Sequence, residues 1–383
     1  MMRLSTFVEF GATCLVASLL LAGCESDLEP LNLPSDLTVQ ETFVGAAKCS
    51  DCHPGKYAEF LESGHAHILN RIVGGQLPSY PFRDEVPFPL LMAPSGSFDD
   101  VLYVVGGFGW KANFVGTDGY LLTGDETQWD LETGEFVAYH PGEQLPYDCG
   151  ACHTTGYSPA GHQLGLAGVV GTWAEDGVTC EACHGPGSLH VLSQSGENIN
   201  LDRSNLLCAR CHSRGVANHI VAYAPDSEGD QFLANYGQYD ELQASPHRNL
   251  TCVSCHDPHL SSKFRPEQAI EIACTTCHEE IEIFNTGGGA HTCKNCHLPS
   301  ASLSAVKRSE NQADVRTHIF RINPAADADM FYQENGNWYA HDFLTTNFTC
   351  LRCHASQDRQ WAQEHADEIH SGEKRGRKNT TVD

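Results

Sequence analysis

Sixteen cysteines of this 383-residue chain fall into one repeated pentapeptide, Cys-x-x-Cys-His, which occurs eight times. Each unit sets two thiols one helical turn apart and places an imidazole directly after the second thiol. Two thiols at this spacing can each add to one vinyl group of haem. The His that follows then lies under the porphyrin, where its imidazole can bind the iron. The repeat therefore predicts eight covalently attached haem c groups.

The motifs are numbered first to eighth in chain order. The predicted attachment residues are the paired thiols Cys49, Cys52, Cys149, Cys152, Cys180, Cys183, Cys208, Cys211, Cys252, Cys255, Cys274, Cys277, Cys293, Cys296, Cys350 and Cys353. The predicted proximal iron ligands are the imidazoles that end the motifs, namely His53, His153, His184, His212, His256, His278, His297 and His354.

Two other uses of paired cysteines compete with haem attachment. Cys-x-x-Cys pairs also build zinc sites, and an even number of cysteines in an exported chain can form disulfides. Neither use requires His directly after the second cysteine of every pair. Only Cys14 and Cys24 fall outside the motifs. We therefore favour haem attachment.

A second axial ligand decides whether a haem iron is closed or open to substrates. Methionine is rare, with only Met92 and Met330 beyond the first two residues, so we expect mostly His ligands and low potentials. The distal candidates chosen by position are His65, His67, His190, His247, His291, His318, His341, His365 and His370; the weaker candidates are His140, His162, His219 and His259. His190 follows the turn Gly185-Pro186-Gly187 and could reach either a nearby haem or a neighbour in the stack.

The start of the chain resembles an export signal. Residues 1–23 contain a short apolar run and end at Leu21-Ala22-Gly23-Cys24, which is similar to a bacterial lipobox. That resemblance implies cleavage before Cys24 and attachment of lipid to its sulfur, whereas ordinary cleavage nearby would leave Cys24 incidental. Residues 24–41 are acidic, contain prolines and read as a tether. We expect an exported lipoprotein, periplasmic or at the cell surface, on the outer rather than the inner membrane.

The remaining chain divides into regions that differ in composition and motif content. We expect a first haem segment at 42–97, a β-rich insert at 98–140, a seven-haem region at 141–370 and a basic tail at 371–383. Within the insert, short β-rich runs alternate with glycine turns such as Asp118-Gly119. Elsewhere the closely spaced motifs leave little room for an apolar core. The predicted fold is therefore mainly α with much irregular loop, with the haems as the core and a small β-hairpin insert.

The chain is strongly acidic, with 49 Asp and Glu against 23 Lys and Arg and a formal charge of -26. This balance argues against nucleic acid as a partner. It favours basic partners, although solubility alone would also explain it.

The motif sequences resemble the multihaem cytochromes c grouped around the tetrahaem cytochrome of ammonia-oxidising bacteria. The resemblance is carried by Cys149–Tyr157, Gly177–Ser188 and Gly106–Lys111, within a region from about Cys49 to His212. It implies respiratory electron transfer in the periplasm or at the cell surface. Two departures are the eight motifs, which exceed the tetrahaem pattern, and the lipobox.

Three functions follow from this resemblance. The favoured one is an electron conduit whose partners are other cytochromes or a membrane quinol oxidase module, with a lipid anchor in the membrane. An octahaem enzyme acting on nitrogen or sulfur compounds at one open haem is the alternative; related nitrite reductases use Cys-x-x-Cys-Lys at that haem, a motif absent here. The 29 residues after His354 also leave little room for the long C-terminal region of hydroxylamine-oxidising relatives. The third is self-association into an extracellular filament.

Overall fold

The computed structural model describes residues 40–278, 292–366 and 368–371. The chain divides into two units, Met1–Gln40 and Glu41–Asp383, and the fold described below is that of the second unit. The predicted export signal, Cys24, His291 and nearly all of the basic tail lie outside the described residues.

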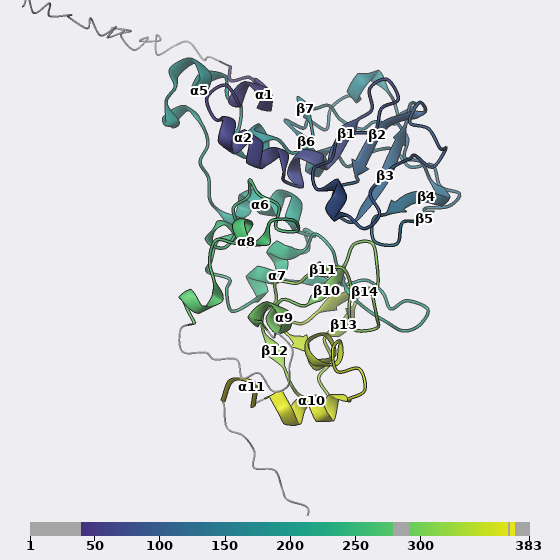
Figure 1. Cartoon of the computed structure of the whole chain (residues 1–383), viewed down its shortest axis with the longest axis vertical. Helices are drawn as coiled ribbons and strands as arrows, with labels where there is room; N and C mark the ends of the chain where they lie inside the picture. The colour runs from purple at the N-terminus through teal and green to yellow at the C-terminus, as the bar shows by residue number, and fades with distance from the viewer. Residues whose placement is uncertain (1–39, 279–291, 367, 372–383) are drawn as a thin grey trace, which may run out of the picture. The chain divides into compact units, whose positions relative to one another are not determined.

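The helices are short, and many of them carry a haem motif (Figure 1). The α-helices are α1 (Ala46–Cys49), α2 (Pro54–Leu61), α3 (Gly150–His153), α4 (Cys180–His184), α5 (Ser188–Ser193), α6 (Asn205–His212), α7 (Gln238–Ala244), α8 (Pro266–Ala269), α9 (Cys293–His297), α10 (Arg359–Ala366) and α11 (Glu368–Ser371). The tighter or wider helical turns are η1 (His65–His67), η2 (Arg83–Glu85), η3 (Gln163–Gly165), η4 (Gly196–Asn198), η5 (Cys252–Ser254), η6 (Cys274–Thr276) and η7 (Asn347–Leu351). None of the described helices is long and apolar enough to cross a membrane.

The strands form several small sheets. They are β1 (Leu69–Arg71), β2 (Val101–Gly106), β3 (Lys111–Gly116), β4 (Gly124–Asp130), β5 (Phe136–Tyr139), β6 (Thr154–Thr155), β7 (Glu175–Asp176), β8 (Ile220–Val221), β9 (Leu233–Ala234), β10 (Ser300–Leu303), β11 (Val315–Arg316), β12 (Ile322–Asn323), β13 (Phe331–Glu334), β14 (Asn337–Ala340) and β15 (Leu344–Thr345). Helices account for 27% and strands for 22% of the described residues. The expectation of a mainly α chain is therefore wrong.

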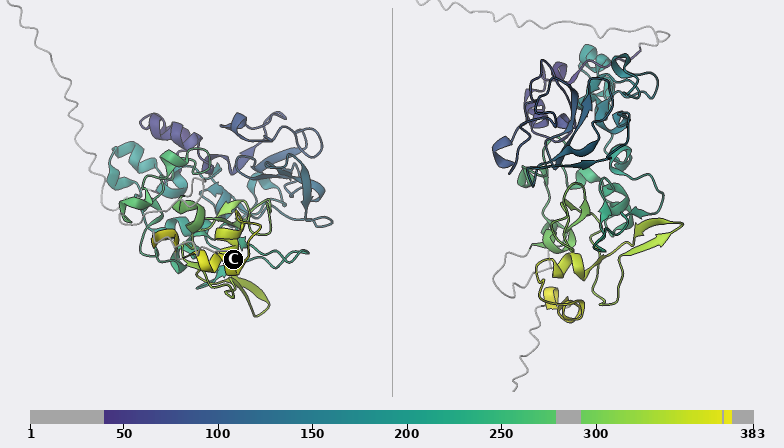
Figure 2. Two further views of the ribbon diagram at one scale, coloured as in Figure 1. Left: turned by 60° about the horizontal axis from the view of Figure 1, so that its bottom comes forward. Right: turned by 90° about the vertical axis from the view of Figure 1, so that its right-hand side faces the viewer.

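The largest sheet is antiparallel with strand order β1-β2-β3-β4-β5, and its strands lie side by side in all views (Figures 1 and 2). The run Tyr120–Thr123, one of the β-rich runs of the insert, makes only isolated bridges. Gly119 has a φ of 89°, and the Asp118 carboxylate accepts the backbone N–H of Tyr120. This turn folds the chain back on β3, where Leu121 bridges to Val115.

Both faces of this sheet are covered by apolar side chains. Tyr103 of β2 packs on one face with Tyr147 and Trp173 from the region of the second motif. Its neighbour Val104 points to the other face and packs with Phe114 of β3. Successive residues of a strand face opposite sides, so one strand serves both clusters. The sheet thus has a core of its own that needs no haem.

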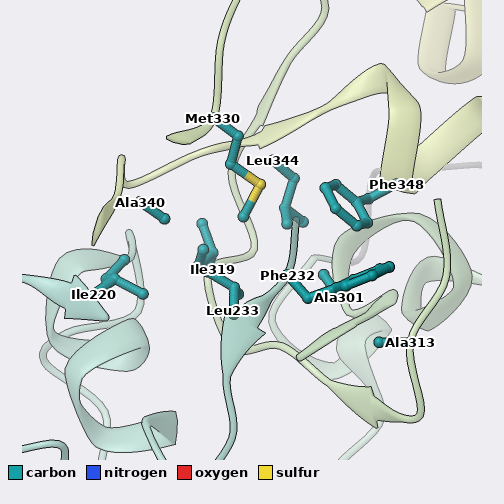
Figure 3. Close-up of a cluster of buried hydrophobic side chains, with 10 residues drawn as sticks. All are labelled: Ile220, Phe232, Leu233, Ala301, Ala313, Ile319, Met330, Ala340, Leu344 and Phe348. Carbon is teal, nitrogen blue, oxygen red and sulfur yellow. The ribbon is translucent and has the colours of Figure 1, made fainter. Parts of the chain in front are cut away.

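A third apolar cluster lies in the C-terminal part, where only the eighth motif follows residue 297 (Figure 3). Met330, Leu344 and Phe348 meet Leu233 and Ile319 there, and all five are buried. The prediction that the haems form the core outside the insert left no place for this third cluster. Segments without a motif are long enough to pair as strands and bury apolar residues against one another.

Candidate functional site

Each Cys-x-x-Cys-His motif folds as about one helical turn. In five motifs the backbone N–H of the His donates to the carbonyl of the first Cys: His53 to Cys49 at 2.9 Å, His153 to Cys149 at 3.2 Å, His256 to Cys252, His278 to Cys274 and His354 to Cys350 each at 3.0 Å. The first, second, third, fourth and seventh motifs lie on or end helices α1, α3, α4, α6 and α9. A closed turn places both thiols and the imidazole on neighbouring sides of one short segment. That is the arrangement covalent haem attachment requires.

Among the described residues, the motif cysteines form neither disulfides nor a cluster that could hold a metal ion. All sixteen are free thiols. Within the described residues, the only group of three or more Cys, His, Asp or Glu side chains close enough to hold a metal ion is Asp226, Glu228 and Asp230. Those three carboxylates bind the Lys307 ammonium. The disulfide and zinc alternatives therefore find no support in the geometry.

Six motif imidazoles face a second imidazole from another part of the chain. The pairs and the distances between their ring centres are His53 with His190 at 6.2 Å, His65 with His212 at 6.3 Å, His184 with His259 at 6.3 Å, His247 with His278 at 5.9 Å, His256 with His318 at 6.1 Å and His297 with His370 at 6.0 Å.

This spacing fits a metal between the two rings. A metal–nitrogen bond to His is about 2 Å long, and a ring centre lies about 1 Å behind its nitrogen. Two imidazoles that bind one metal from opposite sides therefore have ring centres about 6 Å apart. Rings in direct contact come closer, as His365 and Trp361 do at 4.6 Å. The paired residues fit haem iron.

The pairs include five of the nine favoured distal candidates and one weaker one, His259. His190 pairs with the first motif rather than with the adjacent third motif. Of the other favoured candidates, His67 donates from Nε2 to the backbone carbonyl of Leu61 and stacks on Phe108. His341 lies against Tyr332 and Phe343, and His365 lies against Trp361. None of these three forms an imidazole pair with a motif His in the part of the chain the structure describes.

The remaining weak candidates make ordinary polar contacts. His140 meets Glu143 at 3.2 Å, His162 donates to the carbonyl of Val169 at 2.9 Å, and His219 meets Glu334 at 3.0 Å. None of these three rings forms an imidazole pair with a motif His among the described residues.

Burial keeps several of the paired imidazoles neutral. Burial, and secondly the nearby His212, lowers the pKa of His65 to about 4. Burial, and secondly His256, lowers the pKa of His318 to about 4. Burial also lowers the pKa of His212. The neutral ring is the form that binds a metal, so these rings are prepared for iron at neutral pH.

Residues outside the motifs form hydrogen bonds with the candidate ligands. Asp257 accepts from Nδ1 of His259 at 2.7 Å, and Gln238 lies 3.3 Å from Nδ1 of His212. The buried Glu241 carboxylate accepts from the Thr317 hydroxyl at 2.7 Å and from the backbone N–H of His318. Partners of this kind orient a metal-binding His. The sequence reasoning missed all three, although Asp257 directly follows a motif His.

The motifs also approach one another through their thiols, which stand here for the thioether sulfurs of the haem-loaded protein. Thiols of different motifs interact electrostatically, among them Cys49 with Cys180, Cys183 with Cys208, Cys152 with Cys211, Cys208 with Cys252, Cys255 with Cys274, Cys274 with Cys293, and Cys296 with Cys350. Direct packing joins α1 to α4, α3 to α6 and α9 to η7. The electrostatic interactions relate the motifs in the order first, third, fourth, fifth, sixth, seventh, eighth. The second motif joins at the fourth.

Known proteins share these features. The family of doubled CXXCH motifs matches residues 245–283, and the family of cytochrome c554 and c-prime matches residues 128–185. Among curated proteins, the dissimilatory sulfite reductase MccA of Wolinella succinogenes is 24% identical over 76% of this chain and 56% of its own length. The multiheme cytochrome MtrA of Shewanella baltica is 22% identical over 33% of this chain and 37% of its own length. The chain thus spans only part of the length of these relatives.

Solved structures show the same fold. The outer cell wall cytochrome OcwA matches with a TM-score of 0.51 and 17% identity, over 85% of this chain and 86% of that one. The Wolinella succinogenes octaheme sulfite reductase MccA matches with a TM-score of 0.55 and 16% identity, over 83% of this chain and 66% of that one. The resemblance seen in the motif sequences is confirmed: both family models and both curated relatives support a likeness to the multihaem c-type cytochromes.

Proposed function

We propose that this chain is an octahaem c-type cytochrome that relays electrons, with six of its irons held between two imidazoles. The six imidazole pairs carry the proposal. In each pair one ring ends a Cys-x-x-Cys-His motif and the other comes from elsewhere, so the two rings can close both axial positions of one iron. Haem c, when bound, supplies one-electron chemistry at its iron. A chain that closes both positions restricts that iron to passing electrons.

The order of the motifs supports a continuous relay. Electrostatic interactions between thiols relate seven motifs in a row, from the first to the eighth, with the second as a side branch. The sulfurs lie at the edges of the attachment sites, so this order supports a row of neighbouring sites. A row without a break lets an electron that enters at one end leave at the other.

The ligand type supports low potentials. Met330 is buried in the apolar cluster of Figure 3, and Met92 is half exposed, so neither methionine side chain faces a motif imidazole. Axial Met raises the potential of haem iron relative to His. With imidazoles on both sides, the six sites suit a low-potential respiratory chain.

We propose that the chain works outside the cytoplasm, anchored by lipid on Cys24. The lipobox supports this, and OcwA, which shares the fold, is by its name a protein of the outer cell wall. The acidic composition suits redox partners with basic docking surfaces, such as other cytochromes or a quinol oxidase module of the membrane. If the chain assembles into a filament, size-exclusion chromatography should show species much larger than a single chain.

Electron paramagnetic resonance of the oxidised protein tests the relay. We expect low-spin signals that account for six of eight haems, with the total haem fixed by a pyridine haemochrome assay. Clearly fewer than eight haems per chain, or high-spin iron in most of them, would contradict the proposal.

A second function rests on the second motif. Among the described residues, no imidazole pairs with His153 or His354. His153 is partly buried, its Nδ1 is buried without a hydrogen-bond partner, and burial lowers its pKa to about 4. An iron bound on one side only would be open to a small ligand. MccA is by its name a sulfite reductase, so we propose reduction of a small oxyanion at the second motif as the alternative.

Ligand binding separates the two functions. Carbon monoxide added to the reduced protein would bind only open irons. In a separate reduced sample without carbon monoxide, sulfite or nitrite would oxidise the haems if the chain is a reductase. If neither anion oxidises the haems and no haem binds carbon monoxide, the reductase function is excluded and the relay remains.

A further inference from the structure

The six imidazole pairs differ in what holds the outer nitrogen, Nδ1, of each ring. Four of the rings donate from Nδ1 to backbone carbonyls: His65 to Pro258, His184 to Asn200, His190 to Ser195 and His297 to Phe320. An amide oxygen faces His212, and His247 has no partner. Among the partners that the structure describes, only His259 has a carboxylate, that of Asp257.

The contact between Asp257 and His259 is short and enforced by the chain. Oδ1 of Asp257 accepts from Nδ1 of His259 at 2.7 Å and from the backbone N–H of His259 at 2.9 Å. Pro258 lies between the two residues and prevents the helical turn of the fifth motif from continuing. The Asp257 side chain is only 13% exposed, so water screens its charge little.

The other oxygen of the Asp257 carboxylate faces an ammonium group. Lys56 lies 3.3 Å from Oδ2 of Asp257 and also binds Glu59 at 2.6 Å. The carboxylate is therefore shared between one imidazole and one lysine.

We propose that Asp257 makes the iron held by His184 and His259 the lowest in reduction potential of the six bis-His sites. A carboxylate on Nδ1 draws the ring proton toward itself and makes Nε2 a stronger donor to the metal. The ferric iron carries one more positive charge than the ferrous iron, so a stronger donor and a nearby negative charge both stabilise the ferric form. This inference rests on the proposed ligation of that iron by both rings.

The rival carboxylate is Glu241, which lies beside the ligand His318. Glu241 accepts from the backbone N–H of His318 and from Thr317, and it makes no contact with the His318 ring. Its charge acts on the fifth site through space only, whereas Asp257 acts through the ring as well. We therefore place the third site below the fifth.

This ranking has a consequence for the relay. The third motif lies between the first and the fourth in the order given by the electrostatic interactions of the thiols, and α4 of the third motif packs against α1 of the first. An electron that crosses from the first motif to the fourth must then pass one uphill step, and Asp257 sets its height. Changing one carboxylate should alter the rate along the whole row.

Asp257→Asn in the haem-loaded full chain tests the proposal, because the amide keeps the size of the side chain and removes its charge. The readout is a redox titration followed by electron paramagnetic resonance, which resolves individual low-spin irons. We expect the lowest-potential signal to move up, with the preference for ferric iron reduced about tenfold, or about 59 mV for one electron. Asp257→Glu should restore most of the shift.

Glu59→Gln is the matched control, because it removes one negative charge from the same Lys56 ion pair without touching His259. An equal shift in both variants, or no shift in Asp257→Asn while all irons remain low-spin, would overturn the proposal. His259→Ala tests separately whether His259 binds the iron at all. If that variant creates no high-spin iron, the assignment of His259 as a ligand fails instead.

Discussion

The rings of His53 and His190 are stacked 6.2 Å apart, with their planes inclined by only 15°. His53 precedes α2, and His190 lies in α5, so the two rings come from separate parts of the chain. The backbone sets the position of His190, whose Nδ1 donates to the carbonyl of Ser195 at 2.9 Å. The Gly185-Pro186-Gly187 turn therefore carries its imidazole away from the adjacent third motif and toward the first.

Replacing His190 by Ala should open the iron of the first motif. Loss of one axial imidazole leaves a high-spin iron, which should bind carbon monoxide when reduced. The expected change is one additional high-spin haem per chain, measured by electron paramagnetic resonance, and one additional equivalent of carbon monoxide bound.

His67→Ala is the control for this change, because His67 is buried and stacks on Phe108 without pairing with a motif imidazole. It should leave the spin states unaltered. A His190→Ala protein that stays entirely low-spin and binds no additional carbon monoxide would show that His190 is not a ligand.

Local features of the site could be predicted from the sequence, and the pairings could not. Each motif is a five-residue unit closed by its own backbone, so its residues are known as soon as the letters are read. A distal imidazole arrives from another segment, and its partner depends on how the whole chain packs. His259 was underrated for this reason. It follows the fifth motif by three residues, but Pro258 turns it toward His184 of the third motif.

The strand content was predicted too low because segments outside the insert that carry no motif also form strands. One hairpin could have been found from Asn335-Gly336 between two aromatic-rich runs, since both residues have positive φ, 51° and 84°, as a tight two-residue turn requires. The two-residue strands β8, β9, β12 and β15 give no comparable signal. Their pairing is decided by the apolar cluster they enclose.

Glu241 should be essential for placing His318. Its carboxylate accepts from Thr317 and from the backbone of His318, and it is fully buried. Glu241→Ala would leave these donors without partners, at a cost of about 1–3 kcal/mol for each buried group. We expect a lower free energy of unfolding and a partly high-spin iron at the fifth motif, measured by chemical denaturation and by electron paramagnetic resonance.

Glu228→Ala provides the comparison, because this exposed carboxylate binds only Lys307 among the side chains described. It should change the unfolding free energy by no more than about 0.5 kcal/mol. Equal effects of the two substitutions would argue that Glu241 has no special role.

Cys24 should decide where the protein resides. If its sulfur carries lipid, the wild-type protein partitions into the detergent phase of a Triton X-114 extraction, and Cys24→Ser partitions into the aqueous phase. Cys14→Ser changes the other cysteine outside the motifs and should leave partitioning unaltered. Identical partitioning of wild-type protein and Cys24→Ser would refute the lipid anchor.

The antiparallel sheet should contribute stability that is independent of the haems. Phe114 of β3 is fully buried among Val104, Phe98 and Ala112, and none of these is a motif residue. Phe114→Ala would leave a cavity and cost about 3–5 kcal/mol of unfolding free energy. Val73→Ala, at a residue that is 71% exposed, should cost no more than about 0.5 kcal/mol. Denaturation followed by far-ultraviolet circular dichroism measures both. Haem content and redox potentials should remain those of the wild type in each variant, and a shift of the potentials in Phe114→Ala would show that this core and the relay are coupled.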